Sequence, residues 1–247
     1  ARMLIRHMIR HIPGGPSKII PLNVPAAGGI RAFNFVNSVA PKDGSHMVIV
    51  RRGIPFYQLL DGKSLKGDVA KMGWICNLSD SNPVLVTWHT SPTKTLADAK
   101  RRVTLVGGDG KNSITTQVTA AYNRLLGTKF KVLYGYLSGG GVNLAMERGE
   151  IEGRATQNMD SWRATKGDWI RDKKLNFILQ LGLKKERDLP GVPLLQDLVK
   201  GDAEKEKVAR LLAVAHVVGR PIAVAEGVPS DRVAALQQAC AQTVKDK

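Results

Sequence analysis

Apolar and polar positions alternate along this chain with two different periods. Short apolar runs such as HMVIV, GWICNL and NPVLVTWHT are typical of buried strands, whereas SITTQVTAAYNRLLG repeats its apolar residues at helical spacing. Residues 102–156 follow the order strand, glycine loop, helix, strand, glycine loop, helix, strand. Such alternation predicts βαβ units with a parallel sheet, so we expect an α/β protein.

The two glycine loops are the first candidate site. Gly107, Gly108 and Gly110 follow one predicted strand, and Gly139–Gly141 follow the next, ahead of a helix expected from Val142. Right-handed crossovers place both loops at one sheet edge. The first N–H groups of a helix lack partners, so these loops predict close approach by a carboxylate or phosphate oxygen. Ordinary βα turns explain each loop alone equally well.

Other motifs narrow the chemistry. Neither loop matches GxGxxG or a P-loop, which disfavours nucleotides. His7 and His11 have a spacing that zinc can use, but no HExxH accompanies them, so no metal or other cofactor is expected. There is no GxSxG and no catalytic constellation, so the chain is not expected to be an enzyme. Cys76 and Cys240 form no CxxC pair, which leaves buried thiols or a disulfide open.

The net positive charge of the chain favours the binding of anions. The chain has 247 residues, of which 37 are basic and 21 acidic, giving a net charge of +16. Nucleic acid, an anionic membrane surface or anionic small molecules could each use this charge. The basic residues are scattered without a basic tail, and only 5% of residues are aromatic, so a general anion-attracting field is the preferred interpretation. No stretch approaches the roughly 18 apolar residues of a membrane span, and no signal peptide is visible.

A pair of arginines follows the strand HMVIV. If that strand runs parallel to its neighbours, Arg51 and Arg52 also lie at a carboxyl edge, and alternation points one of them inward. Arg52 is the preferred candidate for a bidentate contact with a carboxylate, although a solvated surface pair is an equal alternative. Tyr136 and Trp162 could line an apolar wall or simply pack in the core.

At these residues the chain resembles a known family. The stretches NVPAAGGIRAFNFVNSVAPKDGSHMVIV, SPTKTLADAK, GGDGKNS, YLSGGGVNLAMERGEIEG and GRPIAVAEGVPSDRVAAL are similar, in order, to those of tripartite tricarboxylate transporter solute receptors, the Bug or TctC-like proteins. The resemblance implies a periplasmic-binding-protein fold with two α/β domains, two crossovers and a ligand cleft. It also implies a periplasmic, monomeric receptor that closes on a mono- or dicarboxylate and delivers it to membrane transporter subunits.

The resemblance also carries over a set of site positions, with departures. Leu137 replaces the family's lysine, Ser138 its first glycine and Thr156 its acid, and the family's first strand and glycine loop have no counterpart before Ala1. The expected domains are residues 1–104 with 219–247, and residues 105–218. An α/β enzyme acting on an anionic substrate and a nucleic-acid-binding module remain alternatives. The residues expected to bind the ligand are Arg52, Gly53, Gly107, Gly108, Asp109, Gly110, Asn112, Ser113, Tyr136, Ser138, Gly139, Gly140 and Thr156.

Overall fold

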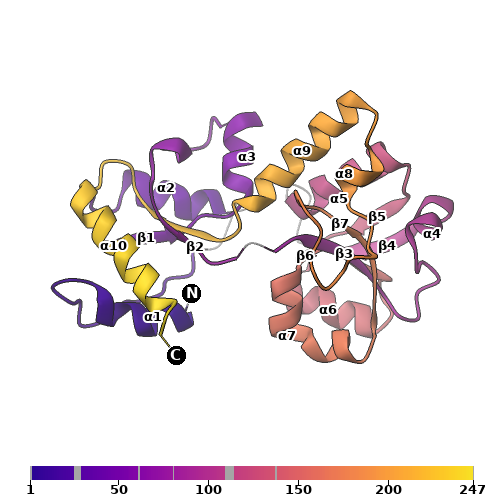
Figure 1. Cartoon of the computed structure of the whole chain (residues 1–247), viewed down its shortest axis with the longest axis horizontal. Coiled ribbons are helices and arrows are strands. Elements are labelled where there is room, and N and C mark those ends of the chain that lie inside the picture. Colours follow the sequence, from indigo (N-terminus) through magenta and orange to yellow (C-terminus); the bar gives the residue numbers. More distant parts are fainter. Residues whose placement is uncertain are drawn as a thin grey trace. The chain divides into compact units, whose positions relative to one another are not determined.

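The chain folds into two compact units. The computed structural model describes residues 2–24, 29–60, 62–79, 81–108, 114–136 and 138–246. Unit 1 comprises Ala1–Asp80 and Val218–Lys247, and unit 2 is the segment Ser81–Val217 between them (Figure 1). The sequence predicts that the chain first passes from one domain to the other at residue 104, whereas in the structure it does so at residue 80. The difference arises because strand β3 (Pro83–Trp88) pairs with two strands of unit 2.

Unit 1 contains a three-stranded sheet that the last strand of the chain completes. Its order is β1 (Met47–Ile49), β8 (Pro221–Val224) and β2 (Gly73–Asn77). Strand β8 is antiparallel to both neighbours, so the condition that β1 runs parallel to its sheet neighbour is not met.

Helices cover both faces of this sheet. One buried cluster joins Phe33 and Val36 of α2 and Ile54 of α3 to Val48 of β1. A second cluster joins Met8 of α1 to residues of β2, β8 and α10, and the disulfide Cys76–Cys240 ties β2 to α10. The disulfide decides between the two alternatives that the sequence left open for the cysteines. The helices of unit 1 are α1 (Arg2–Met8), η1 (Ile9–His11), α2 (Ile30–Ser38), α3 (Gly53–Leu60), η3 (Val69–Lys71) and α10 (Ser230–Thr243).

The segment SKIIPLNV is rich in β-branched and other apolar residues, yet it forms no strand. Residues 17–24 are described and lie outside every strand. Pro21 has no N–H to donate to a ladder, and Ile20 and Leu22 are exposed. An apolar run is therefore not sufficient for a strand where no neighbouring strand pairs with it.

Unit 2 has a five-stranded mixed sheet. Its order is β5 (Phe130–Leu133), β4 (Thr104–Gly107), β6 (Gly153–Asn158), β3 and β7 (Leu175–Gln180). Strand β4 is parallel to β5 and β6, as the alternating pattern predicts. Strand β3 is antiparallel to both β6 and β7, which the pattern did not predict.

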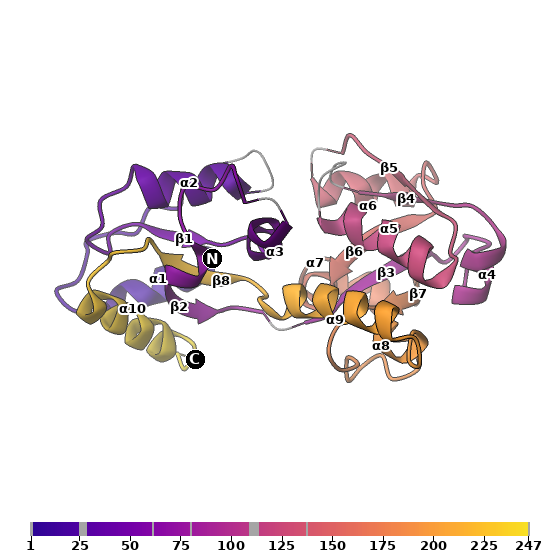
Figure 2. The same ribbon diagram turned by 90° about the horizontal axis from the view of Figure 1, so that it is seen from above.

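The helices of unit 2 follow local signals in the sequence. Thr95 and Asp98 form a capping box at the start of α4 (Leu96–Arg101), and Gly127, with φ of 70°, directly follows α5 (Ile114–Leu126). Helices α5 and α6 contact the parallel strands of the sheet (Figure 2). Within the described residues, no helix combines the length and the apolar character needed to cross a membrane. The helices are α4 (Leu96–Arg101), α5 (Ile114–Leu126), α6 (Gly139–Glu147), α7 (Met159–Arg171), α8 (Leu195–Leu198) and α9 (Ala203–Val217).

Candidate functional site

The two glycine segments of unit 2 lie next to each other at one edge of the sheet. Because β4 and β5 are parallel, Gly107 at the end of β4 pairs with Leu133 at the end of β5. A Cβ on Gly107 would stand 3.3 Å from Cε2 of Tyr136. The structure therefore brings the two predicted segments together. Asp109, Gly110, Asn112 and Ser113, which belong to the same prediction, lie outside the described residues.

The protein's own packing explains the first glycines. A Cβ on Gly107 would stand 2.6 Å from Cδ1 of Ile151 and 2.7 Å from Cγ1 of Val142. A Cβ on Gly108 would stand 2.7 Å from Cγ1 of Val132, and the Gly108 N–H donates to the carbonyl of Leu133 at 3.0 Å. Because Gly107 and Gly108 have no side chains, neighbouring side chains can pack closely against this end of the sheet. The Gly108 N–H is not open to a ligand, because it already donates to a carbonyl of the protein.

The second glycine segment is the first turn of a helix, which corrects the prediction of a loop before Val142. Helix α6 begins at Gly139, and Ser138 caps it by accepting the Gly141 N–H at 3.3 Å. The first N–H groups of an α-helix have no acceptor within the helix. No described residue accepts the N–H of Gly139 or Gly140. These two amides are therefore free to donate to an acceptor from outside the described residues.

Arg154 adds a buried positive charge to this turn, and sequence analysis missed it. It is 9% exposed, and its Nη1 donates to the carbonyl of Gly139 at 3.1 Å and to Oδ1 of Asn143 at 2.8 Å. Its guanidinium carbon lies 5.6 Å from the ring centroid of Trp162, which is fully buried and so belongs to the core. Alternation along β6 was the available signal, because Arg154 precedes the predicted site residue Thr156 by two positions.

Two further predicted residues differ in their access to solvent. Thr156 is buried, at 4% exposure, within β6. Tyr136 is half-buried and packs against the core of unit 2. Burial, and then the charge of Glu150, raise the pKa of Tyr136, so its hydroxyl stays protonated at neutral pH and can donate a hydrogen bond.

In unit 1, antiparallel pairing brings Arg52 beside Arg220. Ile49 pairs with Ile222, and the Val50 N–H donates to the carbonyl of Pro221 at 3.0 Å. The residues that follow β1 therefore lie next to the residue that precedes β8. The sequence could not predict this neighbour, because the two arginines are far apart along the chain.

The surroundings of Arg52 favour an anion. The side chain is half-buried at the start of α3, next to Gly53, and makes no hydrogen bond or ion pair with any described residue. Burial and the charges of Arg220 and Arg51 lower the pKa of Arg52 to about 10, so the group remains charged at neutral pH. A guanidinium held against like charges gains from a negatively charged partner.

Arg51 has a different position from Arg52. It is exposed, and its Cγ lies 2.5 Å from where a Cβ on Gly29 would stand. Gly29 has φ of 101° and directly precedes α2, so both its conformation and the arginine stem require glycine there.

His7 and His11 make contacts with neighbouring side chains. Nε2 of His11 lies 3.0 Å from a carboxylate oxygen of Asp246, and Nδ1 of His7 lies 2.8 Å from Nη2 of Arg10. In the part of the chain that the structure describes, no group of three or more His, Cys, Asp or Glu side chains could hold a metal ion.

Comparison with known proteins was made in sequence and in structure. No protein-family model matches the chain, and no curated protein matches it in sequence. Solved structures do match. A TctC solute-binding protein from Polaromonas is 19% identical with a TM-score of 0.65, over 100% of this chain and 78% of that one.

Two other similar structures contain carboxylates. MatC from Rhodopseudomonas palustris, solved with malate, is 19% identical with a TM-score of 0.70, over 100% of this chain and 79% of that one. A second protein from this organism, solved with adipate, is 15% identical with a TM-score of 0.71, over 97% and 76%. At these identities the likeness establishes the fold, which is that of periplasmic solute-binding proteins.

Proposed function

From this shared fold we propose that the chain is a receptor that binds a small organic anion. The observation that carries the proposal is the half-buried Arg52, whose guanidinium has no partner among the described residues and lies beside two like charges. The similar proteins solved with malate and adipate support a carboxylate as the anion.

Groups suited to an anion are present in unit 1 and, separately, in unit 2. Unit 1 supplies the guanidinium of Arg52 beside Gly53, and unit 2 supplies the open N–H groups of Gly139 and Gly140 next to the buried charge of Arg154. Charge-assisted hydrogen bonds from such donors are stronger than those between neutral groups. Tyr136, Ser138, Thr156 and the segment from Gly107 to Ser113 complete the proposed set.

We further propose that the receptor acts outside the cytoplasm and delivers its ligand to a membrane transporter of the tripartite tricarboxylate type. The disulfide Cys76–Cys240 supports an oxidising compartment. The transporter partner rests on the sequence resemblance and on the TctC type of a similar structure. The ligand is bound and released chemically unchanged.

A thermal-shift panel tests the central proposal. Mono- and dicarboxylates are compared with amines that have the same carbon skeletons. A carboxylate present at 100 times its Kd should add about 2.7 kcal/mol of stability, whereas the matched amine should add none. Absence of any carboxylate effect, or equal effects of acids and amines, would contradict a receptor for anions. Conversion of the acid during incubation, followed by NMR, would favour the enzyme instead.

A further inference from the structure

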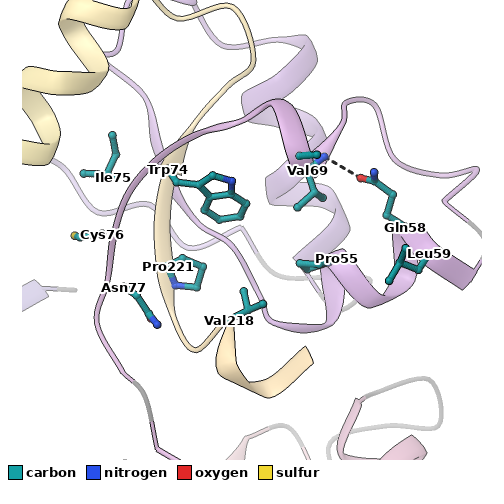
Figure 3. A pocket seen from close by; sticks show the side chains of 11 residues that line it. Pro55, Gln58, Leu59, Val69, Trp74, Ile75, Cys76, Asn77, Val218 and Pro221 are labelled. Carbon is teal, nitrogen blue, oxygen red and sulfur yellow. Dashed lines mark hydrogen bonds between the residues drawn. The ribbon is translucent and has the colours of Figure 1, made fainter. Parts of the chain in front are cut away.

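Unit 1 contains an apolar pocket close in sequence to its arginines. The pocket has a volume of about 580 Å³, within the range of small-molecule sites. Figure 3 shows the indole of Trp74 with Pro221 and Val218 below it and Val69 and Pro55 to its right. Three of these five side chains are rigid rings, which present flat surfaces to a bound molecule.

Two polar side chains of the pocket make hydrogen bonds within the protein. Gln58 accepts the Val69 N–H at 2.8 Å through Oε1 and donates to Oδ1 of Asp68 at 2.8 Å through Nε2 (Figure 3 draws the first bond). Asn77 accepts the Arg220 N–H at 2.9 Å. Among the described residues that line the pocket, none has a charged side chain. A charged group of a ligand would therefore lose hydration there without gaining a partner of opposite charge.

The pocket and the arginines share the same two segments. Arg52 precedes Pro55 by three residues at the start of α3, and Arg220 lies between the lining residues Val218 and Pro221. The pairing of β1 with β8 brings Arg52, which follows β1, next to Arg220, which precedes β8. The two segments that line part of the apolar pocket therefore also carry the two arginines.

Resting on the proposed function, we propose that the ligand is a monocarboxylate with an apolar, ring-bearing body. Its carboxylate pairs with Arg52, and its ring lies in the pocket against Trp74, Pro55 and Pro221. A second carboxylate on the body would enter a pocket in which no described lining residue carries a positive charge to receive it. The site therefore selects against dicarboxylates of similar length.

The test compares phenylacetate, acetate and succinate by isothermal titration calorimetry on the whole chain. Phenylacetate and acetate have the same charge and differ by a ring. Phenylacetate should bind about 10- to 100-fold more tightly than acetate, because the ring leaves water for an apolar pocket. It should also bind more tightly than succinate.

Two variants ask whether the pocket causes the preference. Ala70 is an exposed lining residue, so Ala70→Phe adds a ring at the pocket without disturbing the core. Trp74→Leu removes the central ring. Each should bring phenylacetate close to acetate, whereas Trp88→Leu, a partly buried tryptophan of unit 2, should leave the ratio unchanged.

The outcomes separate the two proposals. Equal affinities for phenylacetate and acetate, or a preference that survives Ala70→Phe, would overturn the role of the pocket while carboxylate binding itself stands. Tighter binding of succinate than of phenylacetate would also overturn it. If the folded protein binds none of the three acids and no other carboxylate of the thermal-shift panel, both this inference and the receptor function fail.

Discussion

The guanidinium of Arg154 occupies the space that a side chain at Gly139 would need. Its Nη2 is the atom nearest to the position of a Cβ on Gly139, and its Nη1 donates to the carbonyl of the same residue at 3.1 Å. The glycine at the start of α6 is thus matched to an arginine 15 residues later on β6. The pair fixes the first turn of the helix whose amides are proposed to bind the anion.

Gly139→Ala should destabilise the protein by about 1–3 kcal/mol, the usual cost of overpacking a filled site. The end of an arginine side chain normally moves aside easily. Arg154 is buried and held by two hydrogen bonds, so its displacement breaks them. Chemical denaturation measures the difference in free energy of unfolding.

Gly140→Ala is the matched control. The nearest atom to a Cβ on Gly140 is Oγ of Ser138 at 3.6 Å, an ordinary contact distance. The variant should be neutral, or more stable by up to about 1 kcal/mol, because alanine loses less entropy in a helix. Equal destabilisation by both alanines would show that the helix turn, and not Arg154, requires glycine.

Loss of the disulfide should lower stability by roughly 2–4 kcal/mol. The bond between Cys76 and Cys240 joins positions 164 residues apart and ties β2 to α10. Breaking it frees a long loop in the unfolded chain. The melting temperature of the natural chain should fall on addition of a reductant. The double variant Cys76→Ala, Cys240→Ala should have a lower melting temperature than the natural chain, and the reductant should not change it. A reductant effect on that variant would contradict this assignment.

Glu152 should make the stability of unit 2 depend on pH in the acid range. Burial alone would raise its pKa, but hydrogen bonds from Arg102, Leu105 and Ser91, together with the charge of Arg102, give a net lowering. A carboxylate with a lowered folded pKa stabilises the protein above its unfolded pKa of about 4.3. That contribution is lost as the pH falls through the lower folded value.

The variant Glu152→Gln isolates this effect. Melting temperatures of the two proteins are compared from pH 7 to pH 3. The difference between them should be constant above about pH 5 and shrink below about pH 4, because only the natural side chain takes up a proton there. A difference that stays constant down to pH 3 would exclude the carboxylate as its source.

Arg52→Gln should weaken carboxylate binding by about 10- to 100-fold, the value of a charge-assisted hydrogen bond in a partly buried site. Arg31→Gln removes the same charge from an exposed position on α2 and should have little effect. Calorimetry at one ionic strength measures both. Equal losses would mean that net charge attracts the anion and that no specific contact exists.

Local signals were sufficient to predict much of the fold. The alternation of apolar runs with glycine loops predicted the parallel strands β4, β5 and β6, and Gly127 marked the end of α5. Pairings between distant segments were not predictable in this way. The antiparallel insertion of β3 between β6 and β7 depends on partners about 70 and 90 residues away, and it moves the crossing between units to residue 80.

Contacts between distant segments also limited what could be predicted about the candidate site. The sequence indicated Arg52 as a candidate because it directly follows a strand, but it did not indicate Arg220, which lies beside Arg52 through the pairing of β1 with β8. It found the glycines but not the reason for them, because Ile151, Val142 and Arg154 occupy the space only in the folded chain. A glycine run in a sequence indicates close approach without saying what approaches.

The central position of β8 constrains the order in which a newly made chain can fold. Strands β1 and β2 pair only with β8 among the described strands, and β8 lies near the C-terminal end. All of unit 2 leaves the ribosome before β8 does. Unit 2 can therefore form during synthesis, whereas the sheet of unit 1 cannot form before residues 221–224 have been made.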